Sequence, residues 1–146
     1  MTSLSFARVR ATSLLAVFLL GAVVAVAKDG RDFAGFYSLS DVTEAGDRVQ
    51  VTLQLQLFNY SGMPLENVAV ALNSAQPESA AIARFAPIKL WPSGKDIMLI
   101  RTITVPREMF DRWRGHTHPN IFITYHDSDG QALEQTAQLT QRAQLL

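Results

Sequence analysis

Hydrophobic and polar residues alternate along most of this chain after residue 35. The clearest stretch has an apolar side chain at every second position, at Val49, Val51, Leu53, Leu55 and Leu57. Glutamine and threonine occupy the positions between them. This period of two predicts a β-strand with one face buried in a core and the other in water.

The same pattern predicts further strands over 36–40, 65–73, 82–90, 97–105, 120–126 and 131–141. Pro87 interrupts the stretch 82–90, so we expect an edge strand or a strand that changes sheets there. One short helix is expected from Pro106 to Trp113, because proline suits the first helical position. The chain is therefore expected to be all-β, a single immunoglobulin-like β-sandwich of about seven strands.

One passage resembles bacterial extracytoplasmic immunoglobulin-like modules of the FxLYD and NEW3 type. It runs from Val51 to Leu72 and reads VTLQLQLFNYSGMPLENVAVAL, about a fifth of the chain after residue 27. The matching residues are Asn59, Ser61, Gly62, Pro64, Leu65, Asn67, Val68 and Val70. The resemblance is at the level of the fold. It implies a binding or assembly module and transfers no catalytic residue.

The first 27 residues have the form of an export signal. Arg8 and Arg10 precede an uncharged run over 11–27 that ends in Ala25-Val26-Ala27, a small-x-small cleavage site. We expect a signal peptide over 1–27 and a mature domain over 28–146. The alternative is an uncleaved membrane anchor, because 17 uncharged residues reach the lower end of a membrane span. Both readings place the domain outside the cytoplasm, as a periplasmic or secreted protein or as one anchored in the inner membrane.

Charge and cysteine content narrow the range of partners. Without Arg8 and Arg10, the domain carries 11 lysines and arginines against 13 acidic residues, with no concentrated basic cluster. A nucleic-acid partner is therefore not expected, because phosphate binding needs such a cluster. The chain has no cysteine, which excludes disulfides and a lipidated cysteine.

All three histidines lie between residues 116 and 126, where imidazoles are candidate metal ligands. His116 and His118 would point the same way in an extended segment and could share one ion. His126 lies about 23 Å further along an extended strand. Two histidines fall short of a tetrahedral ligand set, so we expect an ordinary polar loop and no cofactor. A metal site at His116 and His118 is kept as an alternative.

Interface-type residues are concentrated just before these histidines. Met109, Phe110, Arg112, Trp113 and Arg114 belong to residue types common at binding hot spots. They are our candidate interaction residues. The alternative is that Phe110 and Trp113 cover the open end of the sandwich while the arginines are solvated.

No catalytic residue is predicted. The chain has no G-x-S-x-G elbow, phosphate-binding glycine loop or H-E-x-x-H motif. We expect a non-enzymatic exported accessory or interaction domain that docks onto a larger protein partner in the cell envelope or the extracellular space. The alternatives are a periplasmic metal-binding protein and a membrane-anchored small subunit of an envelope complex.

Overall fold

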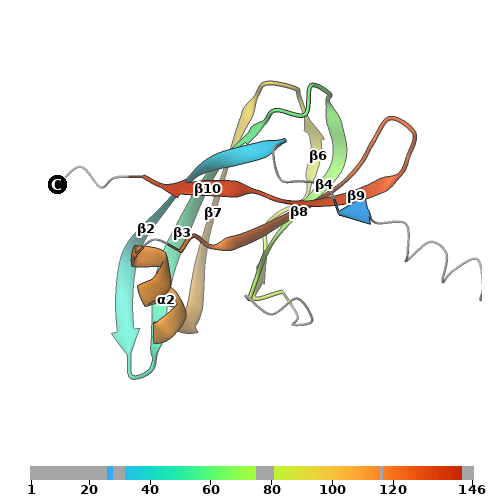
Figure 1. Cartoon of the computed structure of the whole chain (residues 1–146). Coiled ribbons are helices and arrows are strands. Elements are labelled where there is room, and N and C mark those ends of the chain that lie inside the picture. The colour runs from blue at the N-terminus through green and yellow to red at the C-terminus, as the bar shows by residue number, and fades with distance from the viewer. Residues whose placement is uncertain (1–25, 28–31, 75–80, 116, 143–146) are drawn as a thin grey trace, which may run out of the picture.

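The computed structural model describes residues 26–27, 32–74, 81–115 and 117–142, and in these residues two β-sheets face each other (Figure 1). The six-stranded sheet has the order β1 (Val26–Ala27), β9 (Ala132–Thr136), β8 (Asn120–His126), β4 (Leu65–Asn73) and β5 (Ala83–Arg84), with β6 (Ile88–Trp91) also paired to β4. The four-stranded sheet has the order β10 (Gln138–Gln141), β2 (Phe33–Ala45), β3 (Arg48–Asn59) and β7 (Asp96–Pro106). The described part also contains the helix α2 (Arg107–Arg114).

The core lies between the two sheets and follows the alternation of the sequence. The odd positions of β3 from Val49 to Leu57 are completely buried, while its even positions stay at least partly accessible. From the facing sheet, Leu72, Ile121 and Ile123 are also completely buried. Each such side chain contributes about 1.5–3 kcal/mol when it leaves water. The prediction of an all-β, two-layer sandwich is confirmed.

The last predicted strand, over 131–141, proves to be two strands in different sheets. β9 pairs with β8 in antiparallel fashion, whereas β10 pairs with β2 in parallel. Between them the Ala137 N–H donates to the Ile121 carbonyl (3.0 Å), so the chain is held where it changes sheets. The stretch 82–90 is likewise divided, because Pro87 lies in the gap between β5 and β6.

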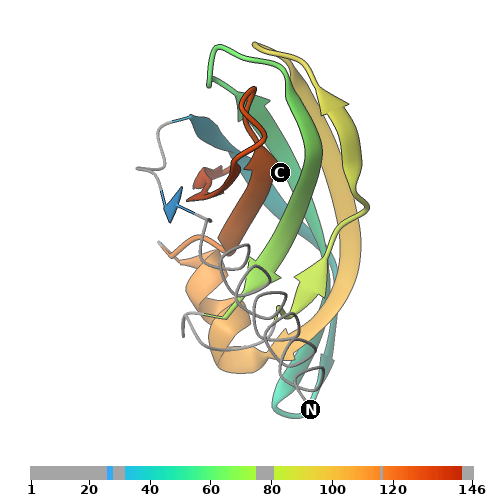
Figure 2. The same ribbon diagram turned by 90° about the vertical axis from the view of Figure 1, so that its right-hand side faces the viewer.

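The helix α2 closes one end of the sandwich (Figures 1 and 2). It directly follows β7 and packs beside β3 and β7. Most of the predicted signal peptide or anchor lies outside the described residues; its last two, Val26 and Ala27, form β1. Among the residues that are described, no helix is long and apolar enough to cross a membrane.

Candidate functional site at the α2 end

The five candidate interaction residues all lie on α2, but they divide between the core and the surface. Phe110 and Trp113 are three residues apart, share one helix face, and are only 3% and 4% exposed. Met109 is half-buried against the same core, and Arg112 and Arg114 are exposed. Phe110 and Trp113 therefore cover the end of the sandwich, and the two arginines are the accessible members of the set.

Both ends of α2 are tied to the four-stranded sheet. The Tyr37 hydroxyl donates to the Trp113 carbonyl at 2.6 Å, and burial raises the pKa of that hydroxyl. At the other end, the Arg107 N–H donates to the Asp47 carbonyl at 2.7 Å. The Arg107 guanidinium also bonds the Gly46 carbonyl and lies 3.1 Å from Glu44. These contacts fix the C-terminal end of α2 to β2 and its N-terminal end to the turn between β2 and β3.

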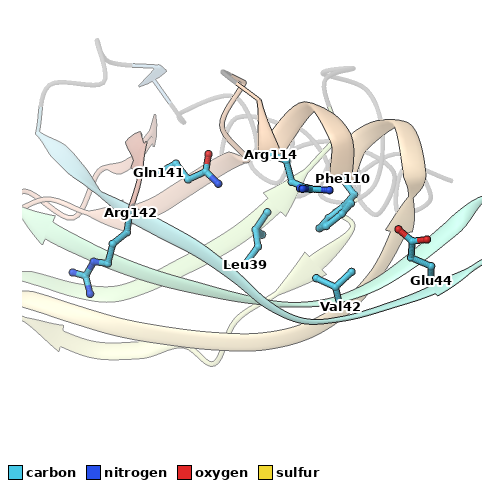
Figure 3. Close-up of a pocket in the computed structure, with 7 residues that line it drawn as sticks. All are labelled: Leu39, Val42, Glu44, Phe110, Arg114, Gln141 and Arg142. Atoms are coloured by element: carbon cyan, nitrogen blue, oxygen red, sulfur yellow. The ribbon is translucent and has the colours of Figure 1, made fainter. Parts of the chain in front are cut away.

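An open hollow of about 480 Å³ lies between α2, β2 and β10, and we name it the α2 groove. Its lining residues are Leu39, Val42, Glu44, Phe110, Arg114, Gln141 and Arg142 (Figure 3).

A β-bulge in β2 shapes the floor of the α2 groove. The register of β2 against β3 shifts between Ser40 and Thr43, and Asp41 adopts a left-handed φ of 51°. Bulges of this kind redirect side chains and are common beside binding sites. Here the bulge leaves Val42 45% exposed in the groove, although valine is usually buried.

The charges of the α2 groove are only partly paired. Glu44 is matched by Arg107, and Arg142 stacks on Phe36 at 5.6 Å and bonds Gln56. The Arg114 guanidinium lies 5.7 Å from the centre of the Phe110 ring, and no carboxylate in the described residues pairs with it. The groove therefore offers the exposed Val42 side chain beside two guanidiniums, Arg114 and Arg142, that pair with no carboxylate in the described part of the chain.

A second hollow, of about 340 Å³, lies on the other flank of α2. It is lined by Asn73, Met109, Arg112, Trp113, Thr117, His118 and Asn120. His118 is exposed, and its Nδ1 atom lies 2.9 Å from the Pro119 carbonyl oxygen. His116 lies outside the described residues, and His126 stands at the end of β8. Within the described ranges, no three His, Cys, Asp or Glu side chains come together as metal ligands.

The sequence reading found the helix side of the α2 groove and missed its strand side. The missed residues are Leu39, Val42, Glu44, Gln141 and Arg142. The sequence carries no clear signal for Val42, because apolar Ala34 and Phe36 already occupy even positions earlier in the same strand. The change of side appears only with the register shift between Ser40 and Thr43.

Comparisons with known proteins add little. No family model matches this chain, and no curated protein does. The solved structure of the N-terminal domain of PorA is 12% identical and aligns over 79% of this chain and 87% of its own length, with a TM-score of 0.29.

Proposed function

We propose that this chain is a non-enzymatic interaction domain that acts outside the cytoplasm and docks onto a larger protein partner through the α2 groove. The observation that carries the proposal is the β2 bulge, which presents Val42 next to Phe110 and Arg114. An exposed apolar side chain in a concave surface is a feature of binding sites.

The order of the strands supports an immunoglobulin-like class. β2, β3 and β7 form one layer in the order of strands A, B and E, and β6, β4, β8 and β9 form the other in the order C′, C, F and G. Loops and helices at the ends of such rigid sandwiches are common binding surfaces. The resemblance of residues 51–72 to envelope modules implies the same kind of role.

The lining of the groove specifies the chemistry of the partner. The exposed Val42 suits an apolar side chain, and Arg114 suits a carboxylate next to it. We infer that the bound element is an extended segment of a partner protein that carries an apolar and an acidic residue close together. A guanidinium–carboxylate contact in a sheltered groove contributes about 1.5–3 kcal/mol, or roughly tenfold or more in affinity.

The test is affinity purification of the full-length chain from native membrane and periplasmic fractions, with partners quantified by mass spectrometry. We expect Arg114→Glu to lower recovery of a specific partner at least about tenfold. Lys89→Glu makes the same change of net charge on β6, which belongs to the other sheet and does not line the groove. This control variant should recover as much partner as the wild-type protein does. Equal recovery by all three proteins would reject the α2 groove as the docking site.

The same preparation tests where the domain resides. The intact mass of the native protein distinguishes a chain that starts at Lys28, and is released, from one that keeps residues 11–27 as an anchor. Recovery of the protein only from the cytoplasmic fraction would contradict export.

A further inference from the structure

The strand β7 forms one edge of the four-stranded sheet, and in the described residues only β3 pairs with it. Two hydrogen bonds at the ends of this pair show which residues of β7 point their backbone groups toward β3. The Asn59 N–H donates to the Lys95 carbonyl, and the Arg107 N–H donates to the Asp47 carbonyl. Antiparallel pairs alternate between bonded and non-bonded residues. The register from Arg48↔Pro106 to Phe58↔Asp96 therefore directs the N–H and C=O groups of odd-numbered β7 residues toward β3.

The even-numbered residues of β7 consequently turn their backbone groups away from the sheet. These residues are Asp96, Met98, Ile100, Thr102, Thr104 and Pro106, the last of which has no N–H to offer. Across the described residues, one of these groups has a partner on the outer side, the Thr104 carbonyl, which accepts from Arg48 Nη2 at 3.2 Å. The strand thus presents a row of backbone donors and acceptors about 30 Å long.

Natural edge strands usually carry features that prevent pairing, such as lysines, prolines or a covering segment. Pro106 is one such feature at the end of β7, but the even positions from 96 to 104 include one charged residue, Asp96, and two large apolar residues. Ile100 is 61% exposed and Met98 is 46% exposed. Arg101 is directed back across its own sandwich, where its guanidinium bonds the Arg84 carbonyl. Among the described residues, no strand therefore pairs with this edge from 96 to 104.

We propose that β7 pairs in antiparallel fashion with β7 of a second copy of this chain, joining two four-stranded sheets into one. A twofold axis at Ile100 sets this residue against Ile100 of the other copy, with Met98 of each copy diagonally beside it on the same face. It also sets Asp96 of each copy against the Thr104 end of the other, where Arg48 lies. The edge is thus complementary to itself in hydrogen bonds, apolar contact and charge, which is what a twofold interface requires.

The size of the edge limits the strength of this pairing. An edge about 30 Å long and one sheet thick buries less than the roughly 1,200–2,000 Å² of a stable specific interface. We therefore expect a reversible dimer with a dissociation constant on the order of 10–500 μM. This surface shares no residue with the α2 groove, so the inference does not depend on the proposed function.

Analytical ultracentrifugation of the full chain from about 5 μM to about 1 mM tests the proposal. We expect a monomer–dimer equilibrium in wild type. Ile100→Lys and Thr102→Pro should each weaken dimerisation at least about tenfold, by removing apolar contact or an edge donor. Thr140→Lys, on the opposite edge strand of the same sheet, is the matched control and should dimerise as wild type does. Circular dichroism verifies that each variant is folded.

Chemical crosslinking gives a second readout, because the chain has no cysteine of its own. Ile100→Cys treated with a short bis-maleimide should yield a covalent dimer, and Thr140→Cys should not. A chain that stays monomeric to 1 mM, with equal crosslinking of the two variants, would overturn the proposal. A dimer that persists unchanged in both Ile100→Lys and Thr102→Pro would also overturn it, because another surface would then hold the copies together.

Discussion

Asn59 is a completely buried polar residue at the end of β3. Its Nδ2 atom donates to the carbonyls of Met63 (2.9 Å), Trp91 (3.2 Å) and Pro92 (3.3 Å). Its Oδ1 atom accepts from the Ser61 N–H and hydroxyl. One side chain thereby holds the β3–β4 turn against the end of β6, and this explains why an amide occupies a core position.

We expect Asn59→Ala to lower the free energy of unfolding by about 2–4 kcal/mol, because several buried backbone groups lose their partner. Urea denaturation followed by circular dichroism measures the change. Gln50→Ala, at an exposed position of the same strand, should stay within about 0.5 kcal/mol of wild type. A similar small effect of Asn59→Ala would mean that water replaces the amide at no cost.

Part of this residue-level detail was readable from the sequence. Asn59 continues the odd-numbered series that runs from Val49 to Leu57, so the pattern alone places it on the buried face. Its partners were not readable, because Trp91 lies 32 residues away and reaches Asn59 only through the pairing of β6 with β4. The α2 groove was not readable for the same reason, because its lining residues on β2 and on α2 are far apart in the sequence and meet only in the fold.

At the scale of the strand, the direction of each backbone N–H in β7, toward β3 or away from it, predicts which positions tolerate proline. Thr102 directs its N–H away from β3, whereas Arg101 directs its N–H toward Leu53. We expect Thr102→Pro to cost less than about 1 kcal/mol relative to Thr102→Ala. Arg101→Pro should cost about 3 kcal/mol or more relative to Arg101→Ala, because it removes a hydrogen bond within the sheet.

Urea denaturation of the four variants measures this difference, and the two alanine variants correct for the loss of each side chain. The Thr52–Thr102 hydroxyl contact (2.9 Å), for example, is lost in both Thr102 variants. Equal costs for the two prolines would contradict the assigned directions of the β7 N–H groups, and with them the geometry on which β7 pairing rests.

The elements themselves were largely predictable, because alternation reports directly on a strand with one buried face. The division of the last strand was not. Leu133, Gln135, Ala137 and Leu139 are all buried, so the period of two continues through the point at which the chain changes sheets. Both sheets face the same core, and a strand that passes from one to the other keeps its pattern.

At the scale of the whole molecule, the α2 groove and the β7 edge are separate surfaces that share no side chain. A dimer paired through β7 would present two α2 grooves on one rigid body. A partner with two matching segments would then bind more tightly than either groove alone allows, through effective concentration and without a new contact.

The core also sets the response of the whole fold to alkaline pH. Burial raises the pKa of the Tyr37 hydroxyl above its usual value. Burial also raises the pKa of Tyr125, against the opposing effect of the hydrogen bond from Gln135. Because the charged form of each tyrosine is disfavoured in the folded state, this stability is fully present below about pH 10 and is lost as the pH rises further.

We therefore expect the free energy of unfolding to fall above pH 10, by up to about 1.4 kcal/mol per pH unit for each buried tyrosine. Urea titrations between about pH 8 and pH 11 measure the slope. The double variant Tyr37→Phe and Tyr125→Phe should be less stable at neutral pH, because the Tyr37 bond to Trp113 is lost, yet should have a shallower slope. Tyr60→Phe is the matched control at an exposed ring and should keep the wild-type slope. If the double variant kept that slope as well, groups other than these two hydroxyls would govern alkaline unfolding.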